Sequence, residues 1–279
     1  MIILTDSGSD LTDAQANEWG VAVVRNPMVV GGENFIENNT ITDEEVMRRM
    51  REGQVVTTSQ PTLGSVIEKV DELLKTYDKV IYVPISSGLS GTYASACSLV
   101  PQYEGRLVVV DSKAVAYLLG YQVQKASEMI KAGYSAEEIK SALEAHYYFA
   151  ILIPENLTAL KRGGRVKPAV AALGNLLKII PLLQVKDGVI DVYEKVRTLK
   201  KAYDRGIEAV VNIPDRDEYE FAVLHTIDMA DAARQKAQEL EALVGKKVYV
   251  GPLRSIIAAH TGPGTLAWGR IRKIHVEQY

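Results

Sequence analysis

Cysteine and histidine are scarce in this chain. Its 279 residues include one cysteine, Cys97, so neither an intrachain disulfide nor a cysteine-based metal site is available. The four histidines form no His-x-x-x-His or similar pair, which removes the usual sequence pattern of a zinc site. We therefore expect no metal ion and no other cofactor.

Long apolar runs are also missing. No stretch reaches the roughly 18 apolar residues that span a bilayer. The first residues, Met1–Asp6, lead directly into an apolar run, without the basic region and cleavage site of a secretory signal. These features predict a cytoplasmic protein without stable membrane insertion.

An excess of charge of one sign is absent as well. The chain has 32 lysines and arginines against 35 aspartates and glutamates, a net charge of −3, with both signs spread along its length. This balance argues against nucleic acid or an anionic membrane surface as the main partner. Neither a P-loop nor a kinase glycine-rich motif occurs, so the donor of any phosphate would be bound elsewhere.

The patterns that predict strands and helices change near residue 150. Before it, apolar runs such as Val80–Val83 end in polar loops followed by helical patterns, which predicts a mostly parallel sheet flanked by helices. After it, Asp187-Gly188 separates two apolar runs, a strong signal for an antiparallel hairpin. We therefore expect an α/β protein with two α/β domains. Residues 1–150 would hold the parallel sheet, and residues 151–279 a mixed or antiparallel sheet with helices.

A loop rich in serine and glycine, Ser86–Tyr93, stands between a predicted buried strand and a predicted helix. Backbone N–H groups at a helix N-terminus favour an anion, and the hydroxyl of Ser90 and the N–H of Gly91 belong to this loop. We interpret the loop as a site for the negatively charged head of a small ligand. A helix cap with spare serines is the alternative interpretation.

Two other polar loops follow the same pattern. Pro61 fits the first turn of a helix, which would place Thr58 and Ser59 at its N-terminus with their hydroxyls free to face a ligand. Thr5–Asp10 follows the first apolar run of the chain. For its two aspartates we favour capping and packing of the ligand loop over a metal or phosphatase role.

Two basic side chains in the second half of the chain have settings that suit a site. The apolar run Ser255–Ala259 predicts a strand that ends at His260, before a Gly-Pro-Gly turn. At a sheet edge, the pKa of His260 would lie near neutrality and suit proton transfer or charge stabilisation. Arg165 ends a basic, glycine-rich segment, which is either a solvated turn or a means of presenting this arginine to a phosphate or an acidic partner.

Seven segments in a fixed order, which together reach across nearly the whole chain, carry a family resemblance. They resemble the signature segments of the DegV family. The segments are Thr5-Asp6-Ser7, Thr58–Thr62, Leu89–Tyr93, Gly163–Arg165, Pro181–Gly188, Glu194–Arg197 and His260–Gly264.

The resemblance implies a function as well as a fold. It implies two α/β domains with a long-chain fatty acid between them, in the lipid-presenting subunit of a bacterial fatty acid kinase. A separate ATP-binding subunit would phosphorylate the acyl carboxylate, so this chain would have no catalytic residues of its own. By the same resemblance, Thr58 and Ser90 hydrogen-bond the carboxylate, with the N–H of Gly91 nearby. Arg165 and His260 would lie near the head group and serve engagement with the kinase.

The sequence departs from the family's pattern in three places. Ala258-Ala259 stands where Gly-Ala is expected before the histidine, and Arg162 adds a second arginine beside the glycines. The segment Arg270–Lys273 is more basic and polar than usual for the family.

Two other functions remain open on the residues alone. In the first, Ser90 or Ser7 acts with His260 in a serine-dependent hydrolase or phosphotransferase, although the chain has no Gly-x-Ser-x-Gly motif. In the second, the chain carries another amphipathic carboxylic acid.

Overall fold

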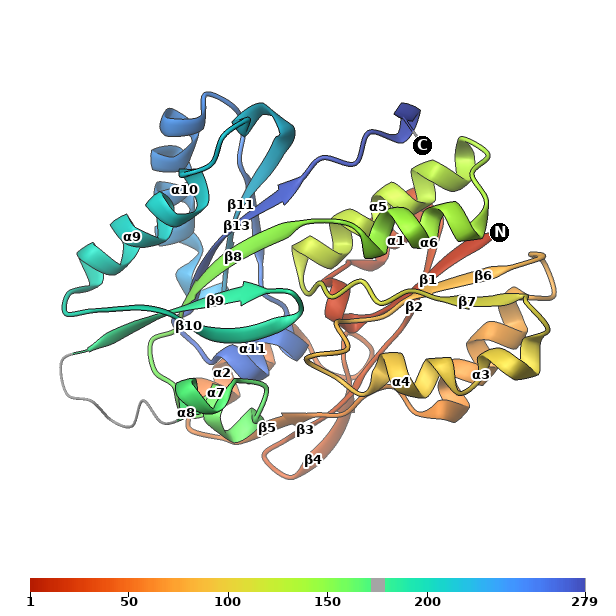
Figure 1. Cartoon of the computed structure of the whole chain (residues 1–279). Coiled ribbons are helices and arrows are strands. Elements are labelled where there is room, and N and C mark those ends of the chain that lie inside the picture. The colour runs from red at the N-terminus through yellow and green to blue at the C-terminus, as the bar shows by residue number, and fades with distance from the viewer. Residues whose placement is uncertain (172–178, 279) are drawn as a thin grey trace.

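The computed structural model describes residues 1–171 and 179–278, which build an α/β protein with three sheets (Figure 1). The first sheet has four strands in the order β2-β1-β6-β7, and every neighbouring pair is parallel. This confirms the parallel sheet expected in the first half of the chain. Its strands are β1 (Ile2–Asp6), β2 (Val21–Val24), β6 (Val80–Val83) and β7 (Leu107–Val109).

Helices cover both faces of this parallel sheet, which explains its continuous apolar strands. Side chains alternate between the faces: Ile3 packs with the core under α5, and Leu4 packs with the core over α3. In Figure 1, α1, α5 and α6 lie on one side of the sheet, and α3 and α4 on the other. The helices are α1 (Asp13–Trp19), α3 (Leu63–Leu73), α4 (Thr92–Cys97), α5 (Tyr117–Lys131) and α6 (Ala136–Glu144).

The second sheet is mixed and has six strands in the order β10-β9-β8-β13-β11-β12, of which only β11 and β12 pair in parallel. The expected domain boundary at residue 150 falls inside β8, which pairs with β9 and β13. Two helices, α9 (Leu199–Val211) and α10 (Ala230–Val244), pack against the six-stranded sheet. The strands are β8 (Tyr148–Ile153), β9 (Ile180–Lys186), β10 (Val189–Val196), β11 (Tyr219–His225), β12 (Tyr249–Pro252) and β13 (Leu266–Arg272).

The predicted hairpin joins the two large sheets at its tip. Lys186 pairs with Val189, and Asp187 and Gly188 both have positive φ, 51° and 79°, as the tight hairpin turn requires. The Ser86 hydroxyl donates a hydrogen bond of 2.9 Å to the carbonyl of Gly188. The serine loop after β6 is therefore held against the β9–β10 turn.

A small antiparallel sheet, which the sequence patterns did not reveal as a sheet, lies beside the others in the order β4-β3-β5. In the chain, α2 (Asp43–Arg51) lies between β4 and β5, and Thr42 caps this helix by accepting from the N–H of Glu45. The strands are β3 (Pro27–Val30), β4 (Glu33–Ile36) and β5 (Val56–Thr58).

Two expectations about local structure are wrong. The apolar run after Arg254 is a helix, α11 (Ser255–Thr261), because Asp43 accepts from the N–H of Ser255 and the run is buried on all sides. Periodicity cannot separate a fully buried helix from a buried strand. Thr58 ends β5 and does not begin a helix, since α3 is capped by Thr62.

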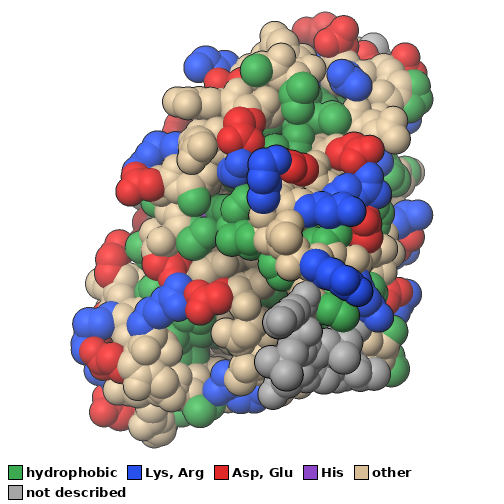
Figure 2. Space-filling view, turned by 90° about the vertical axis from the view of Figure 1, so that its left-hand side faces the viewer, with side chains coloured by type: hydrophobic (Ala, Val, Ile, Leu, Met, Phe, Trp, Pro, Cys, Tyr) green, Lys and Arg blue, Asp and Glu red, His purple; other side chains and the backbone are tan. Residues whose placement is uncertain are grey.

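The surface carries both charge signs close together. On the face at the left of Figure 1, which Figure 2 turns toward the viewer, lysines and arginines lie beside aspartates and glutamates, with hydrophobic side chains between them. Among the described residues, no helix is long and apolar enough to span a bilayer.

Candidate functional site

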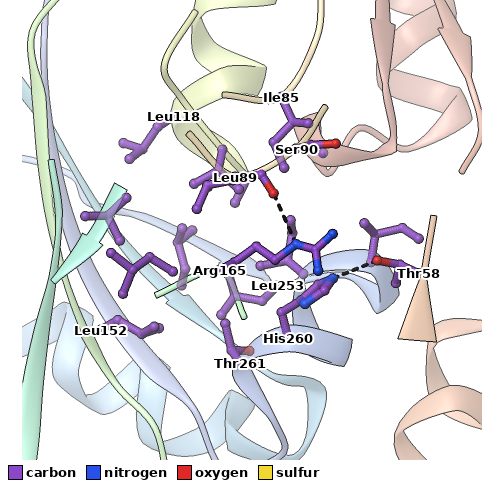
Figure 3. A pocket seen from close by; sticks show the side chains of 18 of the residues that line it. Thr58, Ile85, Leu89, Ser90, Leu118, Leu152, Arg165, Leu253, His260 and Thr261 are labelled. Atoms are coloured by element: carbon purple, nitrogen blue, oxygen red, sulfur yellow. Dashed lines mark hydrogen bonds between the residues drawn. The ribbon is translucent and has the colours of Figure 1, made fainter. Parts of the chain in front are cut away.

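An apolar cavity lies where the two large sheets and α11 meet (Figure 3). About 110 Å³ is open to the centres of water-sized spheres, against roughly 10–15 Å³ needed for a single water. Its walls are aliphatic over most of their length, so its interior suits a hydrocarbon better than water. The wall includes Leu118 of α5 and, from one face of the six-stranded sheet, Ala150, Leu152, Val185, Leu224 and Ala267.

Polar side chains gather at one end of this cavity. Thr58, at the end of β5, and His260, in α11, are 202 residues apart in the chain, yet the Thr58 hydroxyl and His260 Nε2 are 2.6 Å apart. Ser59, Ser90 and Arg165 line the same cavity, so the fold brings together five of the six expected site residues. The sixth, Gly91, lies in an adjoining surface groove that also includes Ser90 and Arg165.

The His260 side chain is enclosed, and its charge state differs from the one expected at a sheet edge. Burial lowers the pKa of His260 to about 4, and the nearby charge of Arg165 adds to the shift. The imidazole is therefore neutral at pH 7, and the expectation of a pKa near neutrality is wrong. His260 Nδ1 and the hydroxyl of the neighbouring Thr261 are buried without a hydrogen-bond partner among the described residues. Both polar groups are thus unsatisfied at this end of the cavity.

A glycine makes room for this histidine. A Cβ atom on Gly163, in α7 (Thr158–Gly163), would lie 2.5 Å from His260 Nδ1, closer than real Cβ contacts. The sequence flagged the segment around Gly163 as basic and glycine-rich, but only the structure shows what the glycine faces. Gly163 therefore fixes how closely α7 approaches the imidazole.

The serine loop offers hydroxyls and few free amides. The N–H groups of Leu89 and Ser90 bond to the carbonyl of Ser86, and the N–H of Gly88 bonds to the Ser86 hydroxyl. The expectation that the N–H groups of this loop are free to bind an anion is therefore wrong for these three residues. The Ser90 hydroxyl lies 2.8 Å from that of Thr92 and lines the cavity. It can still bind a ligand by rotating its proton.

Arg165 brings a positive charge to the mouth of the cavity. It is exposed, and its guanidinium donates to the carbonyls of Leu89 and Gly163, which hold it across the opening. In Figure 3 the Arg165 side chain lies between the serine loop and His260. Among the described residues no carboxylate pairs with it. Its charge is therefore available to an anion at the mouth.

Asn26 is a cavity residue that sequence reasoning missed. Its side chain donates to the carbonyl of Ser59 at 3.0 Å and accepts from the N–H of Ser7 at 3.2 Å. It thereby holds the end of β5 against the loop after β1. A single asparagine in a strand connection gives no signal that would have identified it.

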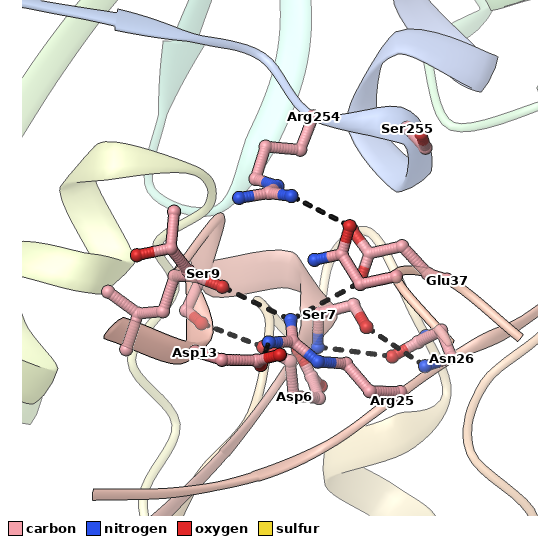
Figure 4. A network of polar contacts seen from close by, with 12 residues as sticks. Asp6, Ser7, Ser9, Asp13, Arg25, Asn26, Glu37, Arg254 and Ser255 are labelled. Carbon is pink, nitrogen blue, oxygen red and sulfur yellow. Dashed lines mark hydrogen bonds and ion pairs between the residues drawn. The ribbon is translucent and has the colours of Figure 1, made fainter. Parts of the chain in front are cut away.

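A buried ionic network supports the site from behind (Figure 4). The Asp6 carboxylate accepts from the N–H groups of Gly8 and Ile85, at 2.8 and 3.1 Å, as the expected capping role requires. Burial raises the pKa of Asp6 to about 6. Arg25 pairs with Glu37 and Asp13, and in the same region Arg254 pairs with Asp43. Among the described residues, no group of three or more His, Cys, Asp or Glu is placed to hold a metal ion.

The geometry of the serines bears on the hydrolase alternative. Ser7 is fully buried outside the cavity lining, and its hydroxyl accepts from the N–H of Asn26. The Ser90 hydroxyl pairs with Thr92, while His260 pairs with Thr58. Neither serine is therefore paired with the histidine that would have to act as its base.

Comparison with known proteins gives one consistent family. Residues 1–273 match the family described as "Uncharacterised protein, DegV family". A DegV domain-containing protein of Clostridium acetobutylicum is 30% identical over 271 residues, which cover 95% of each chain. Among solved structures, a DegV family protein from Thermus thermophilus, described by its fatty acid binding, is 32% identical with a TM-score of 0.86, over 98% of this chain and 99% of its own. DegV from Bacillus subtilis, described as a fatty acid binding protein, is 29% identical with a TM-score of 0.87 and the same coverage.

Proposed function

The chain belongs to the DegV family, and on that premise we propose that it binds one long-chain fatty acid, with the acyl chain in the apolar cavity and the carboxylate at the Thr58–His260 end. The observation that carries the proposal is the cavity itself, which is aliphatic along its walls and polar at one end. A fatty acid has the same division. The fatty acid binding described for the proteins of T. thermophilus and B. subtilis supports the same ligand.

The energetics favour a long chain. Burying each methylene contributes about 0.8 kcal/mol, so a chain of some sixteen carbons gains roughly 10 kcal/mol before the entropy of association is subtracted. The walls supply only apolar contact for most of the chain. Selection of the ligand class therefore comes from the polar end.

Neutral hydrogen-bond donors bind the head group. The hydroxyls of Thr58 and Ser90 donate to the carboxylate, each at a contribution of about 1.5–3 kcal/mol, as is typical of bonds to charged groups. His260 is neutral at pH 7, and its Nε2–H can donate to the Thr58 hydroxyl oxygen, which leaves the Thr58 proton for the carboxylate. Among the described residues, the cavity lining holds no buried lysine or arginine, so the carboxylate keeps its nucleophilic oxygens, and the exposed Arg165 lies at the mouth.

The finer part of the proposal concerns a partner. We propose that the protein presents the carboxylate to a separate ATP-binding fatty acid kinase subunit in the bacterial cytoplasm, which forms the acyl phosphate for phospholipid metabolism. The absence of a P-loop and of a kinase glycine-rich motif in the sequence supports a phosphate donor bound elsewhere. Arg165 and His260 are the residues we assign to engagement of that kinase. In this arrangement residues 1–150 supply the carboxylate loops and residues 151–279 close the lipid site.

A titration of delipidated protein tests the ligand. Palmitate should bind one to one, whereas hexadecanol, which has the same chain and no carboxylate, should bind at least tenfold more weakly because it leaves the polar donors without a charged acceptor. Equal affinity for both ligands would show that the polar end has no role in recognition. Binding of neither would refute the proposal, and tighter binding of another amphipathic acid would assign the cavity to that ligand.

A further inference from the structure

A second pocket lies on the opposite face of the six-stranded sheet from the apolar cavity, between that sheet and α9. Residues alternate between the two: Ala150 and Val185 face the cavity, whereas their neighbours Phe149, Gln184 and Lys186 line the second pocket. Its volume is about 330 Å³. The pocket therefore has room for an organic molecule.

A buried arginine forms one wall of this pocket. Arg270, in β13, has 9% of its surface exposed and belongs to the basic segment that departs from the family pattern. Its Nη1 donates to the carbonyls of Ala209 and Val210 in the last turn of α9, at 2.8 and 3.2 Å. Its guanidinium carbon lies 4.8 Å from the ring centroid of Phe149.

The charge of Arg270 is not neutralised by the protein. No carboxylate among the described residues lies within ion-pair distance of it, and its buried Nε has no hydrogen-bond partner. The carbonyls of α9 satisfy only one of its three nitrogens, and the weak 3.4 Å contact of Nη2 with Tyr147 adds little. Buried cations are normally paired, because leaving one without a counter-ion is costly. An anion in the pocket would remove that cost.

The rest of the lining adds positive charge and aromatic surface. Lys186 is exposed and forms no ion pair with a described residue, while Arg205 pairs with Glu194 and Glu208. The three cations of the lining thus face a single carboxylate within it, that of Glu208. The remaining side chains are the rings of Tyr147, Phe149 and Tyr193, the amides of Gln184 and Asn212, and Ala209.

We propose that this pocket binds a small organic anion, a carboxylate or a phosphate monoester attached to a planar ring. The anionic group pairs with Arg270 and Lys186, as cationic side chains bind carboxylates and phosphates. The ring packs on the tyrosines, and the two amides fix its polar edge. This ligand is distinct from the fatty acid, because the sheet separates the two sites.

Two probes test the pocket: phenyl phosphate and benzoate, titrated by calorimetry with and without saturating palmitate. At least one probe should bind one to one, with an affinity that palmitate does not change. The more tightly bound probe identifies the anionic group. Lys186→Glu should weaken binding at least tenfold. The matched control is Lys200→Glu, which makes the same charge change on α9 at a side chain that is 88% exposed and pairs only with Asp204; it should leave binding unchanged.

Three results would overturn the proposal. They are the absence of saturable binding of both probes to the wild-type protein, competition of the probes with palmitate, and an equal loss of binding in the Lys186 and Lys200 variants, which would indicate general surface charge. Arg270→Met should also abolish binding. If that variant is unfolded by circular dichroism, Tyr193→Ala, at a partly exposed position of β10, replaces it and should weaken binding at least threefold.

Discussion

The Thr58 hydroxyl and His260 Nε2 lie 2.6 Å apart, and this contact joins β5 to α11 at the polar end of the apolar cavity. Thr58 belongs to the small antiparallel sheet and His260 to α11, 202 residues later in the chain. The contact therefore depends on how the small sheet, α11 and the serine loop are packed together. In the fatty acid proposal, the contact orients the Thr58 hydroxyl, whose proton the carboxylate accepts.

Removal of single hydroxyls should weaken fatty acid binding. Ser90→Ala and Thr58→Val each delete one donor to the carboxylate, so each should raise the palmitate Kd about tenfold or more, equivalent to about 1.5–3 kcal/mol. Ser98→Ala and Thr76→Val are the controls, since both positions are exposed and outside the cavity lining. If palmitate binds the test and control variants equally well, the hydroxyls of Ser90 and Thr58 do not bind the carboxylate.

Substitutions of His260 and Arg165 should separate lipid binding from phosphorylation. His260→Ala and Arg165→Ala should retain palmitate within about tenfold, because Thr58 and Ser90 remain and each bond contributes only a few kcal/mol. Acyl phosphate formation with a fatty acid kinase should fall far more. The comparison requires each variant to be saturated with palmitate before the kinase is added. Parallel losses of binding and turnover would contradict the assigned roles.

Gly163 should tolerate no side chain. In Gly163→Ala the new Cβ would lie 2.5 Å from His260 Nδ1, so α7 or the imidazole must shift, at a cost of about 1–3 kcal/mol in the free energy of unfolding. Gly64→Ala is the matched control, because Gly64 also lies in a helix and its nearest neighbour would be 3.9 Å away. That control should be stabilised by about 0.5–1 kcal/mol, as alanine favours a helix over glycine. Urea unfolding of the two variants measures both effects, and equal changes would place no constraint at residue 163.

The stability of the protein should fall as pH rises through 6. Burial raises the pKa of Asp6 from 3.8 to about 6, so the folded protein binds more protons than the unfolded chain between these values. The stabilising contribution of protonated Asp6 is complete below pH 3.8 and disappears above pH 6. Between pH 5 and pH 7 the loss is about 1 kcal/mol.

Urea unfolding at pH 5 and pH 7 tests this contribution. Asp6→Asn should be less stable at both pH values, because asparagine has one oxygen to accept from the two backbone N–H groups of Gly8 and Ile85. Its free energy of unfolding should also depend less on pH. Asp231→Asn, at a side chain that is 97% exposed, should behave like the wild-type protein. A pH dependence that survives in the Asp6 variant would show that other groups, such as Glu37 with its raised pKa, dominate.

Local patterns anticipated much of the fold. Asp187-Gly188 forms the predicted hairpin turn, because this signal depends on residues that are adjacent in sequence. The parallel sheet followed from the alternation of apolar runs and helical patterns. The family resemblance supplied five candidate site residues, and four of them, Thr58, Ser90, Arg165 and His260, line one cavity.

The remaining features depend on contacts between distant residues. The run before His260 is a helix because Asp43, more than two hundred residues earlier, caps it. The pKa of His260 is low because α7 and β5 enclose the ring, and neither neighbour is close to it in sequence. Nor does the sequence show that the N–H groups of the serine loop are bonded within the loop.

Native mass spectrometry of the purified protein, followed by lipid extraction, tests the central claim most directly. We expect one fatty acid per chain in the wild-type protein. None should be retained by Ala267→Phe, where a phenyl ring would fill a wall of the cavity. Ala145→Phe, the same change at an exposed position, should carry the lipid as the wild-type does. A wild-type protein that carries no acyl chain and takes up none from added palmitate, or an Ala267→Phe variant that is folded and fully loaded, would contradict the assignment of this cavity to a fatty acid.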